Sequence, residues 1–246
     1  MLLIHCGGKQ VSYEDLQNIP LPQRTNTYMP VPYDQLVDII KHAAREVFAG
    51  FKLNKAQYAV SKDGNRLFGV LRYGSEIYIG GSSEPDLTSD DIGMAVGFRS
   101  SYDKSIANQL CAGGQVFVCD NLVFTGKIMS MRKHTKLVFD DLLEQTHDML
   151  VQYRQSFHEI EETKEKLKNK SITHDTGYRN LGLLRGHNVL SPTQLTAAID
   201  HWDNPGDGPF AERNRWSLYN ACTEALKSTN QRKIMEKHIA LHHALS

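Results

Sequence analysis

The sequence lacks a net charge, a long apolar run and any closely spaced pair of cysteines. Its 246 residues contain 28 basic and 28 acidic side chains, so the formal net charge is zero. This balance argues against a strongly basic nucleic-acid coat and against an acidic mimic of DNA, although it leaves room for a local basic groove. No run approaches the roughly 18 apolar residues of a membrane span, and the first ten residues do not have the pattern of a secretory signal.

Four cysteines are scattered along the chain, at Cys6, Cys111, Cys119 and Cys222, with no Cys-x-x-Cys pair. An even number of cysteines is compatible with disulfide bonds. In a chain of this length without a signal, reduced thiols in a cytoplasm are the favoured interpretation. With 40% hydrophobic and 23% charged residues, the composition is that of a soluble globular protein and gives no function.

The N-terminal segment, residues 1–32, is poor in apolar anchors and contains four of the eight prolines. We expect an extended arm that wraps around something or pairs with a neighbour. Apolar residues then recur at helical spacing, which predicts a helix over residues 33–49 that is ended by Gly50.

From residue 57 the pattern changes to short β-rich runs, which predict one antiparallel sheet over residues 57–128. Asp63-Gly64 separates the first two runs and is a strong hairpin signal. The predicted strands are 57–60, 67–73, 77–79, 92–99, 114–119 and 122–128.

A long helix follows, with Thr135 as its expected cap and its end near Lys168. Its apolar positions alternate steps of three and four, as in a heptad seam. The seam can lie on the sheet with a solvated far end, or it can pack against a neighbouring subunit. Its members are Leu143, Thr146, Leu150, Tyr153, Phe157, Ile160, Lys164 and Leu167.

Ser191-Pro192 announces a further helix, because Ser191 can act as the N-cap and Gln194 completes a capping box. This helix is expected to end near Trp202, and two more are expected near 212–227 and 231–245. The predicted fold class is α+β: an N-terminal arm and helix, an antiparallel sheet of about five to six strands packed on a long helix, and a C-terminal helical cluster. We divide it into an arm (1–32), an α+β core with the long helix (33–170) and a C-terminal helical region (171–246).

Candidate metal ligands are weak. His238 and His242 lie four residues apart on one helix face, but no third ligand is obvious, and a terminal helix of this kind is more often a solvated face. His174-Asp175 resembles paired ligands of phosphohydrolases, although such a dipeptide is common by chance. No nucleophile elbow or phosphate loop occurs, so we predict no catalytic residue, no metal and no cofactor.

Basic residues with aromatic neighbours are more informative. Several cations lie at the junction between sheet and long helix, where backbone N–H groups can also bind phosphate. They could equally balance acidic residues such as Asp140 and Asp141. The predicted nucleic-acid-binding residues are Arg99, Tyr102, Lys104, Lys127, Arg132, Lys133 and Lys136.

Four segments resemble one family in the right order. VGFRSSYDKS (96–105) is similar to its n-s-h/y-D-x-S segment, and AGGQVFVCDNL (112–122) to its a-G-x-x-V-x-C-x-N strand pair. RKHT (132–135) lies where its R-H-T occurs, and WSLYNACTE (216–224) resembles its W-x-x-Y-N-A-x-T-E. The family is the phage/plasmid-like proteins, domain-of-unknown-function family 932. The resemblance covers roughly residues 57–227, and we expect the chain before and after to lie outside it.

The resemblance implies a protein of phages, prophages or plasmids without an agreed activity, working in the host cytoplasm. A weaker likeness at the level of the fold is to single-strand annealing recombination proteins, whose core is a helix, an antiparallel sheet and a long helix that assemble into rings. The first hypothesis is therefore a non-enzymatic homo-oligomer that binds single-stranded DNA and promotes annealing. The alternative is a protein-binding inhibitor of a host defence or host replication factor. Neither involves a membrane.

Overall fold

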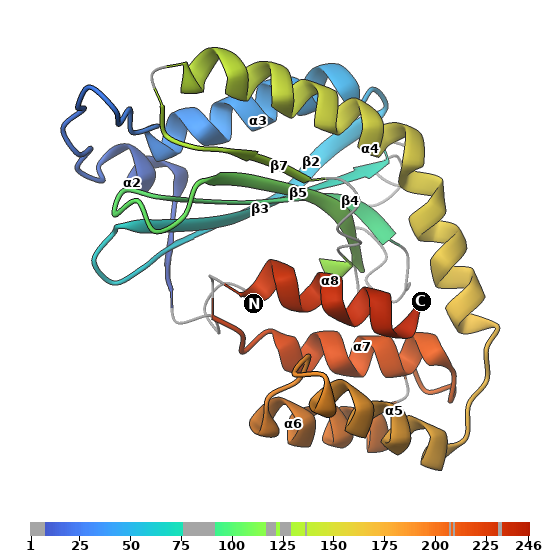
Figure 1. The fold of residues 1–246 in the computed structure, drawn as a ribbon. Coiled ribbons are helices and arrows are strands. Elements are labelled where there is room, and N and C mark those ends of the chain that lie inside the picture. The colour runs from blue at the N-terminus through green and yellow to red at the C-terminus, as the bar shows by residue number, and fades with distance from the viewer. Residues whose placement is uncertain are drawn as a thin grey trace.

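An antiparallel β-sheet forms the middle layer of this α+β protein, with helices on both of its faces (Figure 1). The computed structural model describes residues 8–75, 92–116, 122–123, 129–135, 137–206, 208, 210–230 and 233–246. Within these residues the sheet has seven strands in the order β1-β2-β3-β4-β5-β6, and β7 also pairs with β5. They are β1 (Lys9–Val11), β2 (Phe51–Val60), β3 (Arg66–Ser75), β4 (Ile92–Ser101), β5 (Asn108–Val116), β6 (Leu122–Val123) and β7 (Met129–Arg132).

Two helices, α3 and α4, cover one face of the sheet, and the C-terminal helices lie below the other face (Figure 1). The described helices are α2 (Tyr13–Gln17), α3 (Tyr33–Val47), α4 (Val138–Lys168), α5 (His174–Gly186), α6 (Pro192–Asp203), α7 (Arg215–Leu226) and α8 (Ile234–Leu245). Among the described residues, no helix is long and apolar enough to cross a membrane.

Side chains alternate between the two faces of the sheet, as the period of a strand requires. On β3, Leu67 and Leu71 belong to the main core with α3 and α4. Phe68 and Val70 point the other way and join a second, smaller cluster, where they meet Ile234 of α8. The sheet is therefore buried on both faces.

The seam of the long helix is buried within this chain. Of its eight predicted members, all except Leu143 are buried, and Leu143 is 43% exposed. Tyr153 shows what the seam contacts: its hydroxyl donates to the carbonyl of Gly113 and accepts from the N–H of Ala95, at 3.4 Å. Further along, α4 contacts α7. The interpretation that the seam packs against a neighbouring subunit is therefore wrong.

The N-terminal arm also packs on its own chain. In its described part, β1 pairs with β2, and a capping box of Ser12 and Asp15 caps the N-terminus of α2. Leu16, Tyr28 and Val31 are buried. The arm is less extended than predicted, because these apolar side chains suffice to anchor it to the sheet and to α3.

Most predicted elements are present with altered bounds. Helix α3 ends at Val47, and β2 begins at Phe51 rather than residue 57, because it pairs with β3 along its whole length. Thr135 does not cap α4, which begins at Val138 without a side-chain cap. The strand expected at 77–79 lies outside the described residues, as do residues 117–119 and 124–128 of the last two expected strands.

In the C-terminal region the sequence signals at Ser191 are confirmed. Ser191 accepts from the N–H of Gln194 at 3.2 Å, and the Gln194 side chain accepts from the N–H of Ser191 at 3.0 Å. Helix α5 was not predicted. Its three glycines lower helix propensity, but one of them, Gly177, allows the Trp202 indole to lie directly against the helix.

Two glycines of α5 provide a matched test of this packing. A Cβ on Gly177 would lie 2.4 Å from Nε1 of the buried Trp202, whereas a Cβ on Gly182 meets nothing within 4 Å. We expect Gly177→Ala to lower the free energy of unfolding by about 1–3 kcal/mol through overpacking. Gly182→Ala should raise it by about 0.5–1 kcal/mol through helix propensity. Urea unfolding measures both, and equal stabilisation by the two variants would contradict this packing.

Candidate nucleic-acid interface

Arg99 lies on β4 and faces α8. Its side chain is buried; Nε donates to Oε1 of Gln109 on β5, and Nη1 donates to Oε2 of Glu236 on α8 at 3.2 Å. A second bond joins Nη2 to Oε1 of the same carboxylate. Arg99 therefore fastens the sheet to α8, and its charge is already met by Glu236.

Tyr102 lies in the core rather than on a surface. Its ring stacks on that of Tyr33, with centroids 3.9 Å apart and planes 9° apart. The Tyr102 hydroxyl accepts from the N–H of Tyr33 at 3.1 Å, and its carbonyl accepts from the Tyr28 hydroxyl at 3.0 Å. Burial raises the pKa of Tyr102 to about 12. In this arrangement the ring packs the arm and α3 together and does not offer a face to a base.

Lys104 is exposed in the turn between β4 and β5, and its Nζ lies 4.5 Å from the centre of the Tyr28 ring. That ring in turn lies 5.5 Å from the imidazole of His134. The Met29 N–H donates to the carbonyl of His134 at 3.0 Å. The arm thus brings Lys104 to the segment that follows β7.

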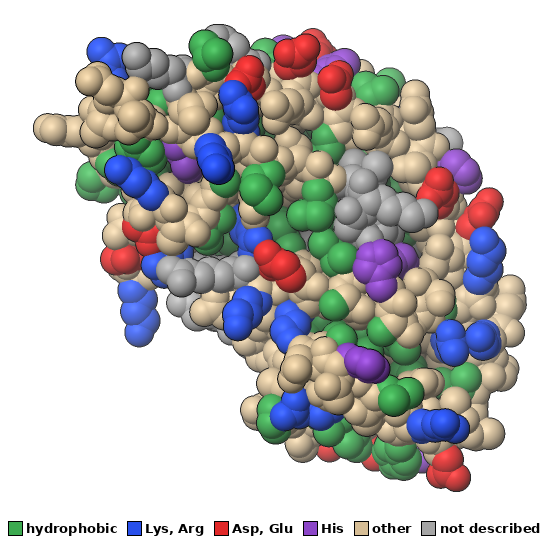
Figure 2. Space-filling view, in the orientation of Figure 1, with side chains coloured by type: hydrophobic (Ala, Val, Ile, Leu, Met, Phe, Trp, Pro, Cys, Tyr) green, Lys and Arg blue, Asp and Glu red, His purple; other side chains and the backbone are tan. Residues whose placement is uncertain are grey.

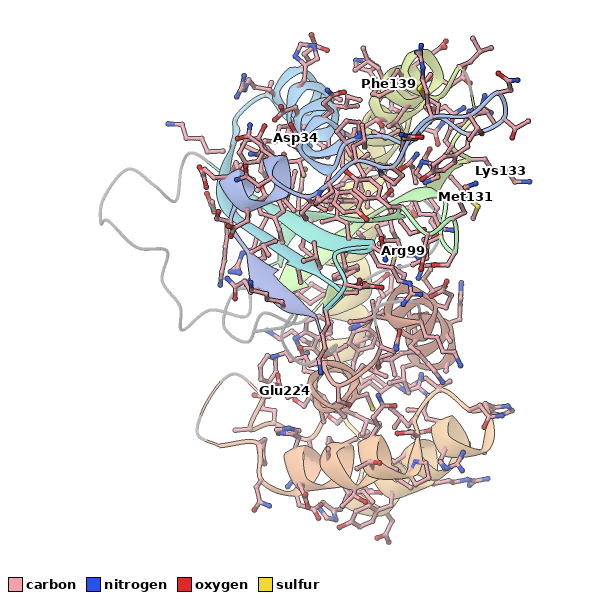
Figure 3. All side chains as sticks on the ribbon, turned by 90° about the vertical axis from the view of Figure 1, so that its left-hand side faces the viewer. Asp34, Arg99, Met131, Lys133, Phe139 and Glu224 are labelled. Atoms are coloured by element: carbon pink, nitrogen blue, oxygen red, sulfur yellow. The ribbon has the colours of Figure 1, made fainter. Side chains whose placement is uncertain are left out.

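At the same end of the sheet, Lys133 is exposed and Arg132 is partly buried in an ion pair with Asp141. Figure 3 shows Lys133, Met131 and Arg99 following one another along one side of the molecule. Lys104, Arg132 and Lys133 therefore lie near one another at the β7 end of the sheet. Two other predicted residues, Lys127 and Lys136, lie outside the described residues.

A second group of cations was not predicted, and we call Arg185, Lys233 and Lys237 the basic cluster. Asn188, which follows α5, holds two of its members: the Lys237 amine donates to the Asn188 carbonyl, and Arg185 Nη1 donates to Asn188 Oδ1 at 3.3 Å. Lys233 lies one turn before Lys237, whose N–H donates to its carbonyl at 2.9 Å. Burial lowers the pKa of Lys237, and the charges of Lys233 and Arg185 lower it further. The cluster therefore carries a positive potential in which cations repel one another.

Strand pairing and side-chain hydrogen bonds inside the fold connect the two basic groups. The pairing of Met131 with Gln109 leads from β7 to Arg99, and Arg99 binds Glu236, the residue before Lys237. Figure 2 shows Lys and Arg side chains on the visible face from the sheet to the C-terminal helices. The one sequence signal for the basic cluster was the charged run near the start of a predicted helix, Arg-Lys-Ile-Met-Glu-Lys at 232–237. No sequence pattern pointed to Arg185.

The described part of the chain holds no group of three or more His, Cys, Asp or Glu side chains that could bind a metal. His238 and His242 are buried and do not form the solvated face expected of them; the His242 ring lies 6.2 Å from that of Tyr219 on α7. His174 Nε2 lies 3.1 Å from Oδ1 of Asp203, so this histidine pairs with α6 and not with the adjacent Asp175. These histidines join secondary-structure elements.

The comparison with protein families decides the assignment. A family model described as a domain of unknown function, DUF932, matches residues 20–246. The chain belongs to this family. The DUF932 match includes α3, strands β2 to β7, α4 and the described helices α5 to α8, so it spans both groups of cations. It also covers residues 20–56 and 228–246, so the expectation that these flanking segments lie outside the resemblance is wrong, whereas residues 1–19 do lie outside the match.

No curated protein and no solved structure matches the chain. The description of the DUF932 family names no activity.

His134 predicts a pH dependence of stability. Burial lowers its pKa below the ordinary value of 6.5, although backbone groups of Ile106 and Met29 oppose the shift. The imidazole therefore binds a proton more readily in the unfolded chain than in the folded chain. The free energy of unfolding falls as the pH falls from about 7 through the pKa of the imidazole in the unfolded chain. We expect His134→Gln to reduce the slope of the unfolding free energy against pH by up to about 1.4 kcal/mol per pH unit.

The measurement is urea unfolding between about pH 7.5 and 5.5. The matched control is His147→Gln, which makes the same substitution at a partly exposed imidazole on α4. Equal slopes for the His134 variant and the parent would refute a coupling between this imidazole and the fold.

Proposed function

We propose that this DUF932 protein is a non-enzymatic, oligomeric protein that binds single-stranded DNA and promotes its annealing. In this proposal the phosphate backbone follows the basic cluster and continues toward Lys104 and Lys133 at the β7 end of the sheet. Phosphate contacts of this kind position a strand without reading its sequence, as annealing of arbitrary strands requires.

The observation that carries the proposal is the basic cluster itself. Asn188 holds Arg185 and Lys237 together, and Lys233 lies one turn before Lys237, at a cost in mutual repulsion that an anion bound between the three cations would relieve. Lys233 itself is exposed beside the start of α8, where a phosphate can reach it.

Acidic partners near the proposed track limit the area over which DNA can be bound. Arg99 and Arg132 are already paired with Glu236 and Asp141, so they add little to the free positive charge. With a net charge of zero, DNA contact would be confined to a narrow track. Binding would then be of moderate strength and sensitive to salt.

The order of elements supports the annealing role. Helix α3, the strands β2 to β5 and the long helix α4 follow one another in the chain, which is the order of the annealing cores that the sequence resembled at the level of the fold. An origin in a phage, prophage or plasmid and action in a host cytoplasm belong to the same proposal. They rest on the resemblance of the family segments.

A second candidate function, inhibition of a host protein, is favoured by one surface. Met129, Met131, Leu137 and Leu143 lie on β7 and near the start of α4, and each is 40% exposed or more. Exposed apolar side chains grouped in this way are typical of protein-binding surfaces. The same surface could hold a second copy of this chain.

Charge removal tests the DNA proposal. We expect Lys233→Gln and Arg185→Gln each to weaken binding of a labelled single-stranded oligonucleotide. Each loss of a phosphate contact should lower the slope of log affinity against log salt by about 0.7. Because each change also relieves repulsion, thermal stability should stay level or rise while affinity falls.

The matched control is Lys166→Gln on α4, which removes the same charge from an exposed side chain outside the proposed track. Parent affinity for both cluster variants, or no binding by the parent at low salt, would overturn the proposal. In the latter case, a stoichiometric complex with a host protein that Met131→Glu abolishes would establish the inhibitor function.

A further inference from the structure

A cavity of about 250 Å³ lies between the end of α6, the segment that follows it and one face of α7. From α7 it is lined by Ser217, Asn220, Ala221 and Glu224, which recur at spacings of three and four and so share one helix face. None of the cations of the proposed DNA track lines this cavity.

The floor of the cavity is polar and fixed. Ser217 and Asn220 are 4% and 3% exposed, and both are held by hydrogen bonds. The Ser217 hydroxyl bonds to Oδ1 of Asn214 at 3.1 Å, and Asn220 Nδ2 donates to the carbonyl of Trp216 at 2.9 Å. Such side chains do not have to be ordered when a ligand binds, which favours recognition by hydrogen bonds.

One wall of the cavity is flat and apolar. Trp202 is part of this wall, but its indole already has partners, since Arg213 lies 4.6 Å from the ring centre and His174 stacks at 6.0 Å. Phe210 is only partly buried and has no aromatic partner among the described residues. Its ring is therefore the one that can lie against a flat ligand.

Glu224 supplies the charge at the rim. Its side chain is 31% exposed, and Lys227 binds Oε2 at 2.5 Å. A carboxylate offers about four acceptor positions, so one lysine leaves most of them for a donor in the cavity. Figure 3 shows Glu224 on the C-terminal helices, in a different layer from Arg99 and Lys133.

We propose that this cavity binds a single nucleobase that carries an exocyclic amino group, as cytosine and adenine do. The Glu224 carboxylate can accept from such an amino group, and the Phe210 ring can hold an unstacked base. A volume of 250 Å³ is below the roughly 300–1,000 Å³ of sites for drug-sized ligands, which suits one base. The base can come from a free nucleotide or from a bound strand, and the second case rests on the proposed function.

The experiment titrates dCMP, dAMP and dTMP into the full chain and follows tryptophan fluorescence, to which Trp202 and Trp216 both contribute, together with ligand-detected NMR. Thymine presents a carbonyl where cytosine presents the amino group, so dTMP should bind more weakly than dCMP by roughly 5- to 150-fold. Equal binding of the three nucleotides, or no binding, would overturn the proposal.

Two variants localise the signal. Ala221→Leu fills the cavity, and Glu224→Gln keeps the side-chain shape while removing the carboxylate. Both should weaken dCMP binding at least several-fold, and Glu224→Gln should also reduce the preference over dTMP. Glu165→Gln, an exposed carboxylate on α4, is the matched control for charge. Unchanged dCMP binding in Glu224→Gln would exclude the assigned role even if Ala221→Leu proved unstable.

Oligonucleotides distinguish the two sources of the base and the two proposals. If a strand supplies the base, the parent should prefer oligo-dC to oligo-dT, and Ala221→Leu should lose the preference while still binding oligo-dT. Binding of dCMP without oligonucleotide binding would keep the cavity and reject the DNA function. Oligonucleotide binding without any discrimination among nucleotides would reject the cavity and keep the DNA function.

Discussion

Helix α8 lies against the sheet face that α3 and α4 leave uncovered, and the start of this helix is buried there. Ile234 and Met235 have no exposed surface and pack on small and apolar side chains of the central strands. Complete burial of two such side chains contributes about 3–6 kcal/mol relative to exposure. This packing holds the C-terminal helices to the sheet, and it places Lys233 and Lys237 next to the residues that follow α5.

The ion pair between Arg99 and Glu236 fixes the register of the same contact. An arginine on a buried sheet face needs a partner, because an unpaired buried charge costs several kcal/mol. Glu236 supplies it from the first turn of α8, between the two lysines of the basic cluster. The carboxylate of Glu236 is therefore paired with Arg99. It does not neutralise the positive charges of Lys233 and Lys237 in the same segment.

Local patterns were enough to predict much of the architecture. The capping box at Ser191, the helical spacing of α3 and the seam of α4 each arise from neighbouring residues, and each has its counterpart in the structure. The pairing of β1 with β2 could not be predicted, because three residues without an apolar pattern become a strand only beside Tyr58–Val60. Helix α5 was missed because its stability comes from packing against Trp202 and not from propensity.

In the candidate sites too, local sequence patterns predicted some residues, while contacts between distant segments decided the others. Lys104 and Lys133 were predicted from basic segments near the sheet, and the contact of the arm with His134 brings them together. Arg99 and Tyr102 were misjudged in their surroundings, since strand pairing and aromatic stacking turned them inward. The basic cluster joins residues about fifty positions apart through Asn188, whose φ of 58° belongs to the left-handed region that asparagine tolerates. No spacing in the sequence could reveal that contact.

The most direct test of the DNA-binding surface is hydrogen exchange of the full chain with and without a saturating single-stranded oligonucleotide. We expect slower exchange in peptides from the end of α5 through Asn188 and from the first turns of α8. Exchange at the charged end of α4, near residues 159–168, should not change. Protection confined to other regions, or none at all with the oligonucleotide bound, would contradict the claim that the basic cluster holds the strand.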